Sequence, residues 1–298
     1  MYPDEFDYHR ADSVQEAVDL LADNVSAETE LLAGGHSLLP TMKSGLASPD
    51  VVIDIGQIDS MSGIEDHGDR VSIGANTTYA DIDDSDLVWE AAPALAEAAH
   101  NVGDVQVRNR GTIGGNLAHA DPASDLPGGA LASDATIVVE GSGGEREVDA
   151  DDFFMGMYMT DVQPGEILTR VEVPKMGEGA GAYAKKPSPS SGYALIGVAA
   201  TLHTDGDRID SADVGANGAM DHGVRLEPVE DGLAGASVND ADALEDAASR
   251  ATDDLDTTMM MEDIQASGEF RAQLLEVYTE RALSAAADRA GGSAAAGD

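Results

Sequence analysis

Residues 108–127 read RNRGTIGGNLAHADPASDLP. The segment is dense in turn-forming residues, hydroxyls and amides, and few of its residues suit a plain linker. Thr112, Asn116 and Asp125 offer groups that hydrogen-bond sugar hydroxyls and phosphates. Gly114 and Gly115 remove side chains from the approach of a ligand. The segment is therefore a candidate ligand-binding loop.

A second glycine pair occurs earlier in the chain, within LAGGHSLLP at residues 32–40. It follows a short apolar strand predicted over residues 30–33, and a helix is predicted to begin at residue 38. Consecutive free N–H groups at a helix start form an anion-binding concavity that suits a dinucleotide pyrophosphate. A glycine pair by itself is most often only a turn. Neither segment has the G-x-G-x-x-G spacing of the ordinary dinucleotide fingerprint, and no G-x-x-x-x-G-K-[ST] phosphate loop occurs.

The apolar pattern of the whole chain predicts an α+β protein in three parts. The first is a small α/β lobe over residues 1–57, and the second is a larger, mostly antiparallel β lobe over residues 58–175. The third is a C-terminal domain over residues 176–290, a three-stranded sheet with a helical bundle. Residues 291–298 are expected to form a frayed tail.

This division depends on segments with clear helical or alternating spacing. Helices are predicted over residues 13–22 and 91–100 and through most of residues 240–287. Strands are predicted over residues 51–55, 64–65, 71–73, 77–79, 135–140, 145–148, 167–173, 181–185, 194–203 and 209–214.

The composition excludes several classes of protein. The chain has no cysteine, so it has no disulfide, no thiolate zinc site and no iron–sulfur cluster of its own. No apolar run is long enough for a membrane span. With 57 acidic against 16 basic residues the net charge is −41, which repels nucleic acid and anionic lipid.

The excess of acidic residues is spread along the whole chain. Self-repulsion at this charge destabilises a fold in dilute buffer, whereas molar salt shortens the Debye length to about 3 Å and screens it. The composition resembles that of cytoplasmic proteins from halophiles that accumulate salt, and we expect a halophilic, cytoplasmic protein. An acidic protein from a non-halophile is the alternative.

The two glycine segments together carry a family resemblance. AGGHSLLPTMK at residues 33–43, followed by the segment at 108–127, resembles the FAD-binding medium subunit of the molybdenum hydroxylases. This family includes the flavoprotein subunit of carbon monoxide dehydrogenase and the middle domain of xanthine dehydrogenase. The similarity in order and spacing continues through residues 73–75, 165–168 and 183–185 to the C-terminal region. It implies that the first two lobes form a two-lobed FAD-binding domain with the cofactor between them.

The resemblance also implies roles for individual residues. The backbone of residues 33–37 would wrap the FAD pyrophosphate, and Asp125 would contact the sugar or ribityl part. Leu168 would lie near the isoalloxazine ring, and the Lys185 cation near the polar edge of the ring would favour the anionic reduced flavin. The implied cofactor-binding residues are Leu32, Ala33, Gly34, Gly35, His36, Ser37, Leu38, Ala75, Thr77, Thr112, Gly114, Gly115, Asn116, Asp125, Leu168 and Lys185.

The loop after Lys185 departs from the family pattern. Members usually have an arginine three residues after this lysine and an aspartate before an aromatic residue. Here those positions are Ser188 and Gly192, the latter before Tyr193. The departure concerns contacts with the flavin ring more than pyrophosphate binding.

The function that the resemblance implies is electron transfer within a larger enzyme. FAD on this subunit would take electrons from iron–sulfur clusters of a partner and pass them to an external acceptor. The implied partners are a molybdopterin-binding large subunit and an iron–sulfur small subunit, in a dimer of heterotrimers. The alternatives are a non-catalytic assembly or nucleotide-binding scaffold that has lost flavin, and a stand-alone flavin oxidase. No catalytic base is evident, and His119, Asp121 and Asp125 lack zinc-type spacing, so neither a catalytic residue nor a metal site is predicted.

Overall fold

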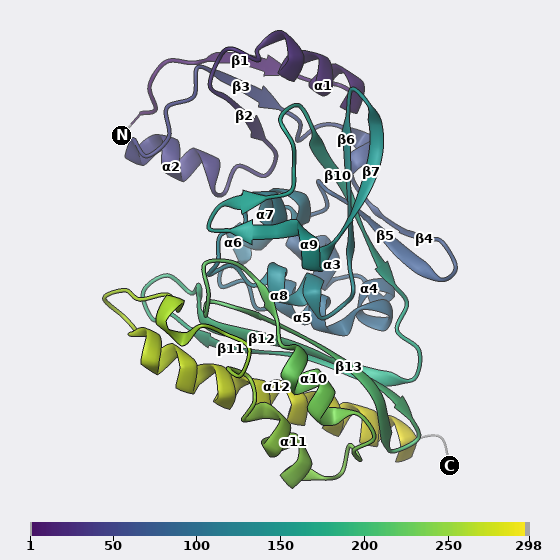
Figure 1. Cartoon of the computed structure of the whole chain (residues 1–298). Helices are drawn as coiled ribbons and strands as arrows, with labels where there is room; N and C mark the ends of the chain where they lie inside the picture. The colour runs from purple at the N-terminus through teal and green to yellow at the C-terminus, as the bar shows by residue number, and fades with distance from the viewer. Residues whose placement is uncertain (1, 296–298) are drawn as a thin grey trace.

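The N-terminal lobe is a parallel sheet with two helices (Figure 1). In the computed structural model, which describes residues 2–295, its strands lie in the order β1-β3-β2. The elements are β1 (Asp7–Arg10), α1 (Val14–Asp23), β2 (Thr29–Leu32), α2 (Leu38–Ser44) and β3 (Val51–Asp54). β3 is central and buried, which its apolar sequence VVID predicts. The strand β1 was not predicted from the sequence, because this edge strand is polar and largely exposed.

The second lobe contains an antiparallel sheet, as predicted, and the structure gives its strand order as β4-β5-β10-β6-β7. Its strands are β4 (Ile64–Asp66), β5 (Arg70–Gly74), β6 (Thr136–Gly141), β7 (Gly144–Asp149) and β10 (Ile167–Pro174), with the separate hairpin β8 (Phe154–Gly156) and β9 (Met159–Thr160). Its helices are η1 (Asp59–Met61), α3 (Tyr79–Asp83), α4 (Asp86–Ala91), α5 (Pro93–His100), α6 (Val105–Arg108), α7 (Ile113–His119), α8 (Leu126–Leu131) and α9 (Ala150–Phe153).

The strand predicted over residues 77–79 is wrong. Tyr79 begins α3, and Thr78 is its N-cap. The Thr78 hydroxyl accepts from the Asp81 N–H at 3.2 Å, and the Asp81 carboxylate accepts from the Thr78 N–H at 3.3 Å. This reciprocal capping box stabilises a helix start, so the two β-branched threonines do not continue into a strand.

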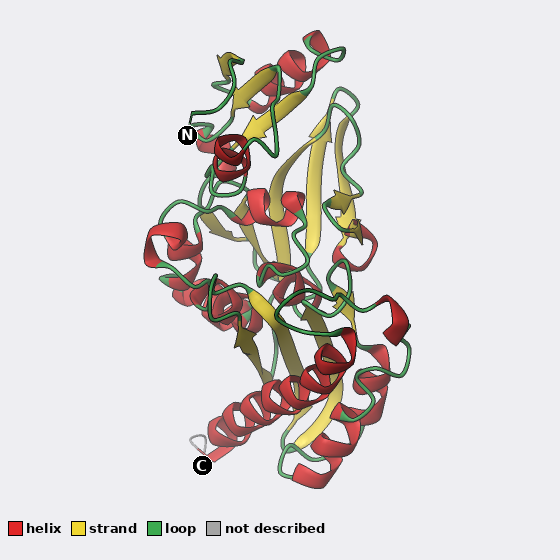
Figure 2. Ribbon diagram, turned by 90° about the vertical axis from the view of Figure 1, so that its left-hand side faces the viewer, coloured by secondary structure: helices red, strands yellow, loops and turns green. Residues whose placement is uncertain are grey.

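The C-terminal domain is a sheet with helices on one side, and it confirms the predicted α+β fold class (Figure 2). Strand order is β11-β12-β13-β14, which adds a two-residue strand to the three predicted. The elements are β11 (Gly179–Pro187), β12 (Ala194–Asp205), β13 (Arg208–Asn217), β14 (Val224–Arg225), α10 (Glu227–Leu233), α11 (Ala241–Ala248), η2 (Thr257–Met259) and α12 (Gly268–Ala295). α12 continues to Ala295 where a frayed tail was expected, because alanine favours helix; residues 296–298 lie outside the described part.

Helix α12 packs against β11 and β12 on the outer face of this sheet, and α5 and α8 of the second lobe pack against its other face (Figure 1). Arg289 of α12 donates to both carboxylate oxygens of Glu97 in α5 at 2.8 Å. Arg225 donates to the Leu131 carbonyl at 2.9 Å and to the Asp151 carboxylate at 2.8 Å. Arginines of the C-terminal domain therefore hold it to the second lobe.

One buried apolar cluster runs through the first two lobes, and it includes Ile53, Ile73 and Leu117. A separate cluster lies between the C-terminal sheet and its helices. Within the described residues, no helix combines the length and the apolar character needed to cross a membrane.

Candidate functional site

The two glycine segments meet backbone to backbone. A Cβ atom on Gly34 would overlap the carbonyl oxygen of Arg110 and would lie 2.9 Å from its carbonyl carbon and 3.1 Å from the Cα of Gly111. Only glycine permits this approach, because any other residue would push the two loops apart. The contact brings the loop after β2 against the loop that precedes α7.

The start of α7 is held equally closely by the residues after β5. The Gly114 N–H donates to the Ala75 carbonyl at 2.9 Å, and the Ile113 N–H donates to the Thr77 carbonyl at 3.0 Å. A Cβ on Gly114 would collide with the methyl group of Ala75, and one on Gly115 would lie 3.7 Å from the Cβ of Ala33. Three segments that are distant in sequence therefore converge at this point.

The loop from Gly34 to Ser37 offers backbone donors to a ligand. None of its four N–H groups donates a hydrogen bond to another residue in the described range 2–295. The loop is half-buried to exposed, and the exposed His36 ring places Nδ1 3.1 Å from the Gly34 carbonyl oxygen. Ser37 precedes α2 without capping it through its side chain. Such free donors at a helix start match the predicted site for the FAD pyrophosphate.

Several residues predicted to contact the cofactor have side chains with other partners. The Thr77 hydroxyl hydrogen-bonds both the N–H and the carbonyl of Gly63 at 3.0 Å. The Thr112 hydroxyl caps α7 by accepting from the Gly115 N–H at 3.3 Å. Leu168 is buried in the core at a bulge of β10. The Thr77 hydroxyl is therefore used within the fold, whereas the Thr112 hydroxyl only accepts there and still has its hydrogen to donate to a ligand.

Asn116 connects the first turn of α7 to the residues around it. Its amide nitrogen donates to the Tyr79 hydroxyl at 2.8 Å, and its amide oxygen accepts from the Ser124 hydroxyl at 2.7 Å. Burial raises the pKa of the Tyr79 hydroxyl, so this group stays protonated. The adjoining Gly115 is exposed, so the outer face of this turn is open to a ligand.

Asp125 and Lys185 are paired with each other, a contact that was not predicted from the sequence. The Lys185 ammonium lies 2.7 Å from one Asp125 carboxylate oxygen, and both side chains are only 5% exposed. The Tyr183 hydroxyl donates to the other oxygen at 2.6 Å. Burial raises the pKa of Asp125 to about 6, although both partners lower it. The signal for Tyr183 was available, since alternate residues of a strand such as Tyr183 and Lys185 point to the same face.

The loop after Lys185 is held by hydrogen bonds between its own residues and by one to Gln265, elsewhere in the C-terminal domain. The Ser188 N–H donates to the Tyr193 carbonyl at 2.7 Å, and the buried Ser188 hydroxyl donates to the Gln265 side chain at 2.6 Å. Gly192 has φ of 78° and packs beside Gly103. The departures from the family pattern therefore lie in an ordered turn that leaves Tyr193 partly exposed.

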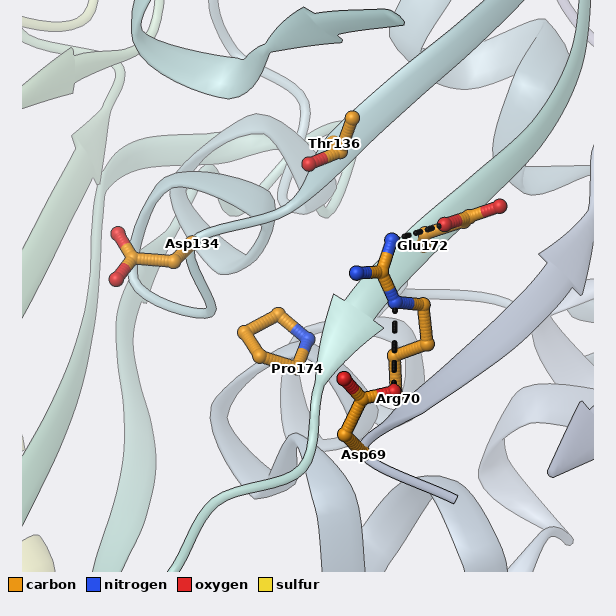
Figure 3. Close-up of a pocket in the computed structure, with 6 residues that line it drawn as sticks. All are labelled: Asp69, Arg70, Asp134, Thr136, Glu172 and Pro174. Carbon is orange, nitrogen blue, oxygen red and sulfur yellow. Dashed lines mark hydrogen bonds and ion pairs between the residues drawn. The ribbon is translucent and has the colours of Figure 1, made fainter. Parts of the chain in front are cut away.

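A cavity of about 150 Å³ lies away from both glycine segments, at the end of β10 (Figure 3). Its lining includes Asp69, Asp134, Glu172 and Arg70, and the Arg70 guanidinium is paired with Glu172 at 2.8 Å and with Asp69 at 3.6 Å. Glu172 is also paired with Arg170, and Asp134 with Arg225, so the Arg70 cation in the lining is already engaged by carboxylates and is not free for a phosphate. In the range 2–295, no three His, Cys, Asp or Glu side chains converge to hold a metal ion.

Comparison with known proteins assigns both halves of the chain. Residues 4–176 match the FAD binding domain in molybdopterin dehydrogenase, and residues 181–286 match the CO dehydrogenase flavoprotein C-terminal domain. The glyceraldehyde dehydrogenase medium chain of Sulfolobus acidocaldarius is 38% identical over 95% of this chain and 99% of its own length. The carbon monoxide dehydrogenase medium chain of Hydrogenophaga pseudoflava is 37% identical over 96% of this chain and 98% of its own.

Solved structures agree with the sequence comparison. The structure of carbon monoxide dehydrogenase from Hydrogenophaga pseudoflava superposes with a TM-score of 0.90 at 37% identity, covering 97% of this chain and 99% of that one. Quinoline 2-oxidoreductase from Pseudomonas putida 86 gives a TM-score of 0.89 at 31% identity, covering 98% of this chain and all of that one.

Proposed function

Because this chain belongs to the FAD-binding medium subunits of the carbon monoxide dehydrogenase and xanthine dehydrogenase family, we propose that it transfers electrons between a partner subunit and an external acceptor. It is the FAD-binding subunit of a molybdenum-hydroxylase-type dehydrogenase and hence part of an oxidoreductase. FAD supplies reversible electron storage when bound, and the chain supplies binding, orientation and electrostatics. In our proposal, electrons arrive from iron–sulfur clusters held by the partner.

The meeting of the two glycine segments is the observation that carries the proposed cofactor site. We place the pyrophosphate against the free N–H groups between Gly34 and Ser37, with the first turn of α7 as the opposite wall. We keep the boundaries at residues 1–57 and 58–175 for the two FAD-binding lobes and at 176–290 for the C-terminal domain. Asp125 and Lys185 lie behind Asn116 and would act on the cofactor mainly through charge.

The partners that we propose are a molybdopterin-binding large subunit and an iron–sulfur small subunit, in a dimer of heterotrimers. Two observations support partners. The chain has no cysteine to hold a cluster, and several relatives are named as medium chains or FAD subunits. The printed names of the relatives also differ in substrate, which fits a division of labour in which the substrate meets another subunit.

An exposed apolar hairpin supports a partner surface close to the proposed cofactor site. Met155, Met157, Tyr158 and Met159 are each about half exposed, and no charged residue interrupts residues 153–160. The Tyr158 N–H donates to the Ala120 carbonyl at 3.2 Å, and its ring lies 5.0 Å from that of His119 in α7. Exposed apolar clusters of this kind mark interaction sites, and methionine adapts well to a partner's shape.

The purified chain is expected to bind one FAD and to co-purify with larger partners from its native source. The test is a visible absorption spectrum after removal of free flavin, with added FAD as a control, together with affinity purification of a tagged chain. Oxidised-flavin bands near one flavin per chain are expected. A folded chain that takes up no FAD would favour the scaffold. A chain with FAD that oxidises a substrate alone and captures no partner would favour the stand-alone oxidase.

We further propose that the acidic composition reflects a high-salt cytoplasm. At −41 the folded chain repels itself, and its 16 basic residues cannot neutralise 57 acidic ones. The thermal unfolding midpoint is therefore expected to rise steadily as KCl increases from about 0.1 M to about 2 M, because the Debye length shortens from about 10 Å towards 3 Å. Sucrose, which stabilises without screening, is the control. A midpoint that rises no more in KCl than in sucrose would contradict the proposal.

A further inference from the structure

The side chains of Tyr183 and Lys185 point to the same face of β11, and each donates a hydrogen bond to one oxygen of the Asp125 carboxylate. The Tyr183 hydroxyl donates to Asp125 Oδ1 at 2.6 Å, and the Lys185 ammonium donates to Oδ2 at 2.7 Å. The exposed fractions are 4% for Asp125 and 6% for Tyr183, so water contributes little to solvating this carboxylate. Its charge depends on these two donors, and both come from the C-terminal domain.

The position of the Tyr183 hydroxyl is determined by the strands beside it. Lys185, Gly197 and Asn217 are directly paired across β11, β12 and β13. A Cβ on Gly197 would overlap the Tyr183 hydroxyl and would lie 2.7 Å from the Asn217 amide nitrogen, so glycine is required there. The Asn217 amide nitrogen lies 3.5 Å from the Tyr183 hydroxyl, while its fully buried amide oxygen has no partner in the described residues. An unpaired amide oxygen at a fully buried position is energetically costly.

The cluster directly adjoins the proposed cofactor site. Ser124, the residue before Asp125, donates its hydroxyl to Asn116 in the first turns of α7. Lys185 also donates to the Asn101 carbonyl at 3.1 Å, which is contributed by the second lobe. The ion pair therefore joins the two domains at the back of the site.

We propose that Tyr183 is a positioning residue for the flavin site, which fixes the Asp125 carboxylate on Lys185 and so keeps this ion pair neutral beside the cofactor. The inference rests on the proposed function, because it assumes that FAD binds in front of Asn116. When Asp125 takes up a proton, the Lys185 charge is no longer offset, and a positive charge near a flavin favours its reduced anionic form. Tyr183 thus determines the pH at which the local charge changes.

Burial lowers the pKa of the nearby His119 ring, so this group also titrates in acid, but of the two only Asp125 accepts a hydrogen bond from Tyr183. Burial raises the pKa of Asp125 to about 6, and its hydrogen bond from Tyr183 lowers that pKa. Burial raises the pKa of the Tyr183, Tyr79 and Tyr193 hydroxyls near it, so all three remain neutral. On the far side of Tyr183, the Glu97 carboxylate accepts from the Tyr183 N–H and is neutralised by Arg289. Removal of the Tyr183 hydroxyl therefore raises the pKa of Asp125 further.

The test is the midpoint potential of the bound flavin as a function of pH in the full chain. In the parent protein we expect an inflection near the pKa of Asp125. In Tyr183→Phe we expect the flavin content to stay near one per chain and the inflection to move upward by about one pH unit, the size of a lost hydrogen bond to a charged group. Tyr8→Phe is the matched control, because Tyr8 donates to the Asp54 carboxylate at the same 2.6 Å but lies in β1.

An inflection at the same pH in Tyr183→Phe and in the parent protein would overturn the proposal. A second variant, Asp125→Asn, is expected to remove the inflection, and an inflection that persists would overturn it equally. If the parent chain binds no FAD, the proposed function fails by itself. Infrared titration of the Asp125 carboxyl in the flavin-free chain then tests the inference. The Asp125 carboxyl must still titrate at a higher pH in Tyr183→Phe than in the parent chain.

Discussion

Gly34→Ala is expected to weaken FAD binding about 100-fold while leaving the chain folded, since two N–H hydrogen bonds to a phosphate contribute about 1.5 kcal/mol each. A Cβ at this position overlaps the Arg110 carbonyl oxygen, so the loop after β2 must move away from α7. The displaced N–H groups of residues 34–37 then no longer face the opposite wall. Isothermal titration of the flavin-free chain with FAD measures the change.

A matched glycine variant separates this effect from a general response to alanine. Gly143 lies in the exposed turn between β6 and β7, and a Cβ there meets no atom within 4 Å. Gly143→Ala should therefore bind FAD like the parent chain. Equal affinities in Gly34→Ala and Gly143→Ala would show that the pyrophosphate lies elsewhere.

Lys185→Met is expected to lower the free energy of unfolding by about 3–5 kcal/mol, the usual loss when one partner of a buried ion pair is removed. The Asp125 carboxylate keeps the Tyr183 hydroxyl but loses its cation in a site that is almost closed to water. Urea denaturation at about pH 8, followed by circular dichroism, measures the loss. Lys186→Met, at a neighbouring half-buried position with no ion pair in the described residues, is the control.

The stability lost in Lys185→Met should depend on pH, and the pKa of Asp125 determines whether the loss grows or shrinks as the pH rises. Its folded value near 6 lies above the unfolded value near 3.9, so the folded chain holds this proton more tightly and stability falls as the pH rises through that interval. Without Lys185 the folded pKa rises further and the interval extends upward. Lys185→Met should therefore be less destabilised at about pH 5 than at about pH 8.

A double variant tests whether the uncompensated charge is the cause. Asp125→Asn combined with Lys185→Met leaves no buried charge, and we expect it to recover part of the lost stability. A double variant that is less stable than Lys185→Met alone would instead assign the loss to packing of the lysine side chain.

The glycine segments could be identified from the sequence because glycine has no Cβ atom, and this alone permits the close contacts that it makes. Gly34 and Gly114 are required where two backbones approach more closely than any side chain allows, and that requirement is local to the residue. Strands such as β3 and β12 were equally evident, because buried strands are continuous apolar runs. These features, with the long similarity to a known family, were enough to predict the α+β fold and the FAD assignment.

Features that depend on exposed edges or on competing local bonds were not evident. The strand β1 is polar because it lies at a sheet edge, and nothing in DYHR distinguishes it from a loop. The residues around Thr78 have strand-like side chains, yet a capping box makes them a helix start. Residues 113–119 appeared to be part of a glycine-rich loop. They form α7 because the Thr112 side chain caps the helix and the Ala75 carbonyl accepts a hydrogen bond from the N–H of Gly114 in its first turn.

By itself, the sequence determined the type of fold and the loops that contain the glycine pairs, because these depend on residue type and short-range spacing. The family and the cofactor followed from the resemblance, which extends over nearly the whole chain. Only the tertiary structure determined which side chains meet. Asp125 and Lys185 are 60 residues apart, and Tyr183 reaches the same carboxylate because Gly197 leaves room in the neighbouring strand. An ion pair between distant segments depends on how sheets and helices pack, and neither its partners nor its burial can be read from a local pattern.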